Sequence, residues 1–110
     1  MKSKLEIDKD GDKEWRLPNG KRHREDGPAV EYFDGNKEWW LNGKLHREDG
    51  PAVEYSNGDE EWWLNGKRHR EDGPAVEFNS DHKQWWLNGI EYTEQEYKKK
   101  MRLIKLKYIL

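Results

Sequence analysis

Cysteine is absent from this 110-residue chain, so disulfides and thiolate–zinc sites are excluded. Long apolar stretches are absent too: no run approaches the ~18 residues of a membrane span. The first residues also lack the apolar segment of a secretory signal. We therefore expect a cytoplasmic protein with no metal, no cofactor and no membrane association.

A strong net charge is also missing from the chain. Lys and Arg number 21 and Asp and Glu number 23, which leaves a net charge of −2. A generic nucleic-acid or membrane-surface binder needs a net basic face, so nucleic acid is not the partner we expect. Charged residues nevertheless make up 40% of the chain, and the mean hydropathy of −1.43 is typical of disordered chains.

Aromatic residues argue against disorder, because seven Trp and five Tyr are present and most recur at a fixed spacing. The nonapeptide His-Arg-Glu-Asp-Gly-Pro-Ala-Val-Glu recurs with a step of 23 residues, and its copies begin at His23, His46 and His69. The segment Trp-Trp-Leu-Asn-Gly recurs with the same step, and its copies begin at Trp39, Trp62 and Trp85. An earlier copy, with Arg16 in place of the second Trp and with Pro18 inserted, begins at Trp15. A disordered chain has no reason to place Trp periodically.

Turn signals punctuate each repeat. Asn-Gly begins at residues 42, 65 and 88, and Asp-Gly or Asn-Gly begins at residues 34 and 57. Both dipeptides favour the type I′ hairpin turn, and the segments between them have strand composition and length. Gly-Pro before each Ala-Val is expected to start a strand, since proline cannot donate to a sheet ladder. We predict an all-β repeat protein: tandem antiparallel β-hairpins that form one elongated twisted sheet, with a C-terminal α-helical cap.

The repeat resembles the MORN repeat, a 23-residue β-hairpin unit with a Trp-x-Asn-Gly-Lys core. The departure is Arg-Glu-Asp between the His and the Gly, followed by Pro, which is similar to a MORN-like variant found in proteins of bacteriophages, some bacteria and large viruses. The resemblance implies a scaffold or binding surface and supplies no catalytic residues. The residues that match the pattern are Trp63, Asn65, Gly66, Lys67, His69 and Gly73.

Three regions follow from the repeat: an N-terminal cap segment (residues 1–12), the hairpin array (13–89) and a C-terminal amphipathic helix or cap (90–110). Thr93 and Glu96 have the spacing of a capping box that starts a helix. The helix is expected to cap the open end of the sheet, and self-association, partner binding and membrane-surface binding are its alternatives. The last residues alternate like a strand, which is a further alternative. A helical apolar stripe follows the capping box at Tyr97, Met101, Ile104 and Tyr108.

The repeated His-Arg-Glu-Asp tetrad contains the residue types of metal sites and of acid–base catalysis. Adjacent repeats are expected roughly 9–10 Å apart, too far for their imidazoles to share a zinc ion. We favour a structural use, in which Arg pairs with an acid, Asp bonds the turn backbone and His packs on a Trp. A repeated partner contact is the next alternative and catalysis the last. The candidate contact residues are His23, His46, His69, Arg24, Arg47 and Arg70.

The paired tryptophans place large aromatic side chains on both faces of the sheet, because consecutive strand residues point to opposite faces. One ladder is Trp15, Trp39, Trp62 and Trp85. The second is exposed to a partner or is covered by Lys and Arg side chains. This second ladder, a candidate partner-binding stripe, consists of Arg16, Trp40, Trp63 and Trp86.

The leading hypothesis is a non-enzymatic protein-interaction module with a protein partner. The resemblance extends it to a phage-encoded inhibitor of a host defence protein, acting in the host cytoplasm. One alternative is a small enzyme or nucleotide-binding protein that uses the His-Arg-Glu-Asp loops. Another is nucleic-acid binding through the basic C-terminal tail. A homodimer, joined by a sheet edge or by the helix, is also open.

Overall fold

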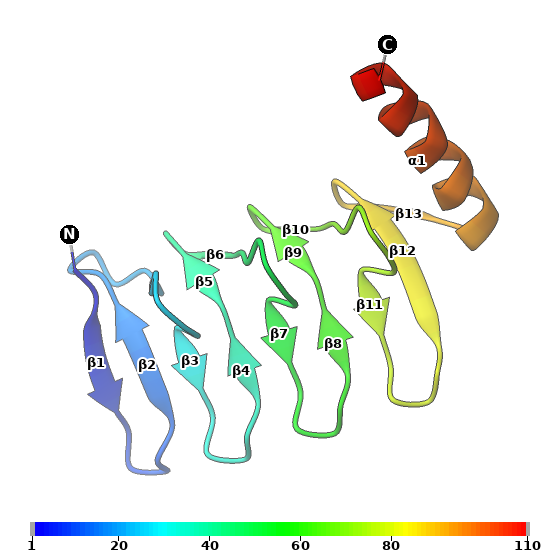
Figure 1. The fold of residues 1–110 in the computed structure, drawn as a ribbon. Helices are drawn as coiled ribbons and strands as arrows, with labels where there is room; N and C mark the ends of the chain where they lie inside the picture. The colour runs from blue at the N-terminus through cyan, green and yellow to red at the C-terminus, as the bar shows by residue number, and fades with distance from the viewer. Residues whose placement is uncertain (1, 110) are drawn as a thin grey trace.

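One long antiparallel sheet forms the body of the protein (Figure 1). The computed structural model describes residues 2–109. Four hairpins lie side by side in the strand order β1-β2-β3-β4-β7-β8-β11-β12-β13. The predicted hairpin array with a helical cap is confirmed. The strands are β1 (Lys4–Ile7), β2 (Lys13–Arg16), β3 (Val30–Glu31), β4 (Lys37–Glu38), β7 (Val53–Glu54), β8 (Glu60–Glu61), β11 (Val76–Glu77), β12 (Lys83–Leu87) and β13 (Ile90–Tyr92).

Each complete repeat contains a second, shorter hairpin above the sheet (Figure 1). The strands β5 (Trp40–Leu41) and β6 (Lys44–Leu45) form one such pair, and β9 (Trp63–Leu64) and β10 (Lys67–Arg68) form the next. The chain leaves the long sheet at Trp39 and at Trp62, whereas Trp85 and Trp86 both lie within the continuous strand β12. At Trp39, for example, the amide donates to the carbonyl of Ala52 (2.7 Å) and the carbonyl accepts from the amide of His46 (3.0 Å). Trp39 and Trp62 therefore separate a strand of the long sheet from a strand of the upper hairpin.

The core of the array is thin and built from small residues. The Ala-Val pair that follows each Gly-Pro is buried in every repeat. The amide of the alanine donates within its own hairpin, as Ala29 does to the carbonyl of Glu38 (2.8 Å). The alanine carbonyl accepts from the preceding hairpin, as Ala29 does from the amide of Trp15 (2.8 Å). With so little aliphatic volume, the array depends on contacts between side chains of adjacent repeats. The buried pairs are Ala29 and Val30, Ala52 and Val53, and Ala75 and Val76.

The upper turns have the backbone that their Asn-Gly sequence predicts. Asn65 has φ +50° and the following Gly66 has φ +79°, the left-handed pair of a type I′ turn. Asn42 and Asn88 have the same φ of +50°. Asparagine tolerates this region because its short polar side chain lowers the steric cost.

The C-terminal helix α1 (Glu94–Ile109) begins at the predicted capping box. The amide of Thr93 donates to the carboxylate of Glu96 (2.8 Å), and the amide of Glu96 donates to the Thr93 hydroxyl (3.2 Å). The first of these bonds lowers the pKa of Glu96 below its ordinary value. The helix continues to Ile109, so the alternative of a terminal strand is wrong. No helix among residues 2–109 is long and apolar enough to span a membrane.

The first twelve residues add a hairpin strand to the array. β1 pairs antiparallel with β2, with Leu5 opposite Trp15. The outer edge of β1 ends the sheet on this side, and all four of its residues are exposed. The N-terminal segment thus extends the sheet by one strand.

We predict that Asn65→Val lowers the free energy of unfolding by about 1–2 kcal/mol, because a β-branched residue is strained at positive φ. The matched control is Asn65→Gly, which keeps the turn geometry without strain. Urea unfolding followed by tryptophan fluorescence measures both variants. Equal midpoints for the two would contradict the assignment of backbone strain to this position.

Candidate functional site

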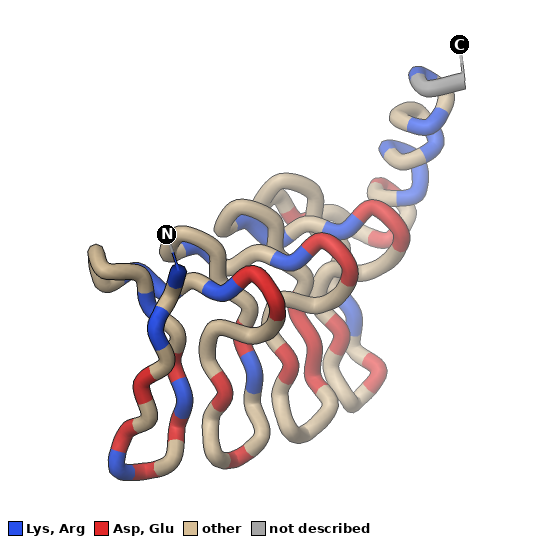
Figure 2. The backbone as a smooth tube through the Cα atoms, turned by 60° about the vertical axis from the view of Figure 1, so that its left-hand side comes forward, with Lys and Arg blue, Asp and Glu red and all other residues tan. Residues whose placement is uncertain are grey.

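Three equivalent loops, each carrying the His-Arg-Glu-Asp tetrad, lie in line along one edge of the molecule. We name them loop 1 (residues 23–28), loop 2 (46–51) and loop 3 (69–74). Figure 2 shows their acidic segments recurring at the same place in successive repeats. The 23-residue repeat of the sequence therefore corresponds to a regular spacing of the loops along the molecule.

The arginine of each loop stacks on the first tryptophan of its repeat. In loop 2 the guanidinium carbon of Arg47 lies 3.9 Å from the ring centroid of Trp39. Its Nε donates to Asp49 (3.2 Å), and its terminal nitrogen donates to the carbonyl of Pro51 (3.0 Å) and to Glu54 (3.0 Å). The planar guanidinium therefore joins the tryptophan, the loop and the sheet in one contact.

Loops 1 and 3 repeat this arrangement. Arg24 lies 3.8 Å from the centroid of Trp15, and Arg70 lies 3.9 Å from that of Trp62. We expected histidine to pack on the tryptophan and aspartate to bond the turn backbone. Arginine takes the first role, and the aspartate accepts from that arginine (2.9 Å in both loops).

The histidine of each loop joins its repeat to the next one. The Nδ1 atom of His46 accepts a hydrogen bond from the backbone amide of Asn65 (2.9 Å) in the following upper turn. His23 and His69 make the same bond to the next repeat, at 3.0 and 2.9 Å. Since Nδ1 accepts, the proton of the neutral ring sits on Nε2, which faces the glutamate of the same loop.

The carboxylates of the loops point into solvent. Their side chains are between 60% and 89% exposed, while the arginines beside them are mostly buried. The hydrogen bond and the charge of Arg24 hold the pKa of Asp26 below its ordinary value, so this carboxyl is ionised at neutral pH. We call this set the acidic ridge; it consists of Glu25, Asp26, Glu48, Asp49, Glu71 and Asp72.

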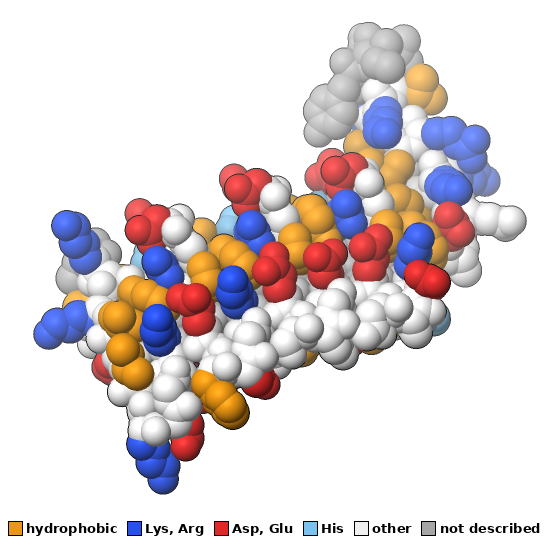
Figure 3. All heavy atoms as spheres, turned by 60° about the horizontal axis from the view of Figure 1, so that its bottom comes forward, with side chains coloured by type: hydrophobic (Ala, Val, Ile, Leu, Met, Phe, Trp, Pro, Cys, Tyr) orange, Lys and Arg blue, Asp and Glu red, His pale blue; other side chains and the backbone are white. Residues whose placement is uncertain are grey.

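The second tryptophan ladder is half-buried and covered by arginine. Trp40 donates its indole N–H to Glu38 (2.8 Å), and Trp63 and Trp86 make equivalent bonds to the residue two positions earlier. Arg68 lies 5.2 and 5.1 Å from the centroids of Trp63 and Trp86. Figure 3 shows hydrophobic side chains interleaved with basic and acidic ones along the array. At the first position of this ladder Arg16 bonds Glu14 (3.1 Å). The candidate stripe is therefore a partly covered surface.

The candidate partner residues of α1 face the array. Tyr97 and Met101 are buried against Leu87, and Ile104 packs beside them. The side chain of Tyr108 lies outside the described residues. Among the side chains of α1 up to Lys107, Leu103 and Leu106 are the exposed apolar ones, at 57% and 50%.

A contact between α1 and loop 3, not predicted from the sequence, joins the helix to the array. The hydroxyl of Tyr97 donates to the carbonyl of Arg70 (2.6 Å) and accepts from the amide of Gly73 (3.2 Å). Burial raises the pKa of this hydroxyl, so it stays neutral and able to donate. A signal existed in the 23-residue step, which places Thr93 where a fourth loop would carry its arginine. The helix therefore stands where the fourth loop would be.

No protein-family model matches this chain, and no curated protein or solved structure matches it significantly. Within residues 2–109, no cluster of three or more His, Asp or Glu side chains has the geometry to hold a metal ion.

We predict that Arg47→Lys lowers the free energy of unfolding by about 1–3 kcal/mol, because lysine keeps the charge but loses the stacked, forked geometry. Arg102→Lys on the exposed face of α1 is the matched control and should have little effect. Thermal unfolding by circular dichroism measures both. A loss of similar size in the control would show that charge geometry at loop 2 is not the cause.

His46→Phe should lower the free energy of unfolding by about 1 kcal/mol, because the ring keeps its volume but Asn65 loses its acceptor. His82→Phe, at an exposed position whose ring makes no hydrogen bond within residues 2–109, is the control. Urea unfolding compares the two midpoints. The inter-repeat role of the imidazole is refuted when both variants unfold at the wild-type midpoint.

Proposed function

We propose that this chain is a non-enzymatic protein-interaction module and that the acidic ridge is its binding face. One observation carries the proposal: each loop commits its histidine and arginine to structure and leaves its two carboxylates in solvent. Three copies repeat this division. Chemistry that needs a free imidazole is poorly served by rings whose Nδ1 atoms accept backbone bonds.

The ridge favours a basic partner surface. Its carboxylates lie along one edge of a chain whose net charge is only −2, so the negative charge is local. The arginines hold the backbone of each loop in place, and a pre-ordered surface loses less entropy on binding. Exposed charges of this kind steer association and set specificity more than they add affinity.

In this proposal the tryptophan ladders stabilise the array beneath the acidic ridge, and the ridge contacts the partner. The rings of Trp40, Trp63 and Trp86 are half-buried and already donate their N–H groups within the chain. A binding hot spot would offer such rings to solvent. The proposal therefore moves the contact from the predicted aromatic stripe to the loops.

The resemblance to MORN-like repeats of bacteriophages supports a narrower form of the proposal. In this form the partner is a host protein, one of an antiviral defence system, and the chain inhibits it by occupying a basic surface. MORN-type arrays generally act as scaffolds or binding surfaces, which is consistent with inhibition by binding alone.

We predict that E25Q/E48Q/E71Q abolishes capture of a specific protein from a bacterial lysate by the tagged chain, because the ridge loses three charges without losing volume. The control E6Q/D10N/D81N removes three exposed charges elsewhere and should retain capture. Affinity purification with mass spectrometry measures both, and circular dichroism verifies folding. Equal recovery by the two variants would place the binding face elsewhere.

A further inference from the structure

The contact between Tyr97 and loop 3 shows what kind of group a loop binds. The phenol hydroxyl donates to one backbone carbonyl, at Arg70, and accepts from one backbone amide, at Gly73. A group that satisfies this pair must be both donor and acceptor, as a hydroxyl is. Tyr97 is only 5% exposed, because its ring packs on Leu87 and Met101 beside the loop.

Loops 1 and 2 carry the same backbone pair. The equivalent groups are the carbonyl and amide of Arg24 and Gly27 in loop 1, and of Arg47 and Gly50 in loop 2. The loops share one conformation, since the bond from the arginine to the proline carbonyl is 3.1, 3.0 and 3.1 Å in loops 1 to 3. Within residues 2–109 nothing bonds the pairs of loops 1 and 2.

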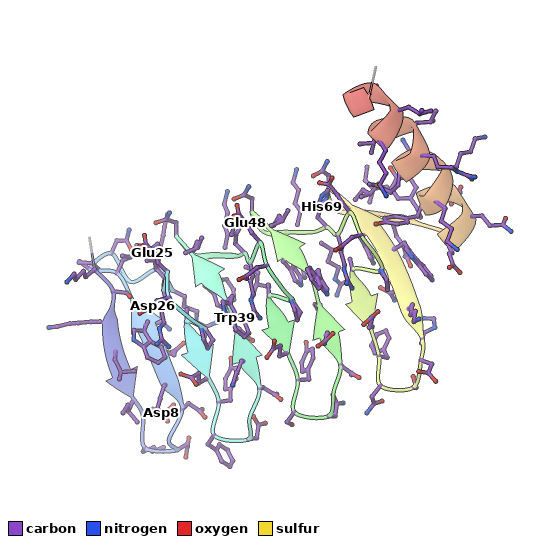
Figure 4. All side chains as sticks on the ribbon, viewed as in Figure 1. Asp8, Glu25, Asp26, Trp39, Glu48 and His69 are labelled. Atoms are coloured by element: carbon purple, nitrogen blue, oxygen red, sulfur yellow. The ribbon has the colours of Figure 1, made fainter. Side chains whose placement is uncertain are left out.

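A groove gives access to the pair in loop 1. It lies between loops 1 and 2, has a volume of about 660 Å³ and reaches Gly27. Trp39 and Leu41 form its apolar part, and four ridge carboxylates, two from each loop, line it as well. Figure 4 shows Glu25 and Asp26 on loop 1, Glu48 on loop 2, and Trp39 on the hairpin of β4 and β5.

The groove beside loop 3 is its counterpart. There Trp85 stands in the place of Trp39, and α1 supplies Tyr97, Met101 and basic side chains including Lys98. Glu71 and Asp72 of the ridge line the same groove. One end of the array therefore shows an aromatic hydroxyl with basic neighbours seated against a loop, while the groove between loops 1 and 2 contains no such group from residues 2–109.

We propose that the groove between loops 1 and 2 binds a tyrosine side chain of the partner protein, flanked by lysine or arginine. This inference rests on the proposed interaction function and names the partner's chemistry. The tyrosine hydroxyl bonds the carbonyl of Arg24 and the amide of Gly27. Its ring lies against Leu41, the equivalent of the Leu87 that Tyr97 packs on, because Arg47 already covers the face of Trp39. The flanking cations face Glu25 and Glu48 on the rim.

The test uses the ¹⁵N-labelled full-length chain and the peptide acetyl-Lys-Lys-Tyr-Lys-Lys-amide. Saturable shifts are expected at the amide of Gly27. The chemical-shift difference at the Gly73 amide between wild type and Tyr97→Phe gives the direction of shift that a bonded hydroxyl causes. The Gly27 amide should shift in the same direction when the peptide binds. The matching peptide with Phe in place of Tyr should bind roughly tenfold more weakly, because it loses both hydrogen bonds.

A second variant separates the hydroxyl from charge. E25Q/E48Q should weaken both peptides and leave the Tyr-to-Phe ratio of affinities unchanged. Equal affinities for the two peptides, shifts that map away from Gly27, or no binding at millimolar peptide would each overturn the inference. The capture experiment with E25Q/E48Q/E71Q does not depend on the peptide result. Loss of capture together with failure of the peptide test would therefore overturn this site and leave the interaction function supported.

Discussion

The stack of arginine on tryptophan is the contact on which the rest of the structure depends. Each repeat buries little more than an alanine and a valine, which is too little apolar volume for a self-supporting core. The guanidinium of Arg47 covers the face of Trp39 and spends its hydrogen bonds on the loop and on Glu54 of the sheet. A very hydrophilic chain can thus fold because its arginine side chains cover the tryptophan rings, as aliphatic side chains do in an ordinary core.

The second requirement is that each repeat hold the next one. The imidazole of His46 joins two repeats by accepting a hydrogen bond from the amide of Asn65. Beside it, the amide of Gly66 donates to the carbonyl of Leu45. At the lower turns Asn36 accepts from the amide of Ser56 in the following hairpin. These bonds are made only between neighbours, so the array behaves as a one-dimensional stack whose ends need protection. The helix α1 protects one end.

Local signals in the sequence predicted the local structure well. The positive φ of Asn65 follows from Asn-Gly, and the start of α1 follows from Thr93 and Glu96, because both depend on residues three or fewer positions apart. The break between β4 and β5 at Trp39 could not be predicted in this way, since the amide of Trp39 bonds Ala52 in another hairpin. The same limit hid the covering of the tryptophans: alternation predicts which face a side chain takes, and the packed structure decides what covers it.

The end of the array supports the proposal that the loops bind a partner. Where the repeat stops, Thr93 replaces the arginine that would have stacked on Trp85, and that ring packs instead beside Tyr97 and Met101. Tyr97 bonds one carbonyl and one amide of loop 3. The contacts within the repeat leave these two backbone groups without a partner in the equivalent loops 1 and 2 of the described chain. The cover that the chain supplies at its own end supports the proposal that the same surface binds a partner elsewhere along the array. In each loop the arginine and the histidine bond other parts of the chain and keep that surface rigid. The carboxylates lie in solvent and leave it accessible.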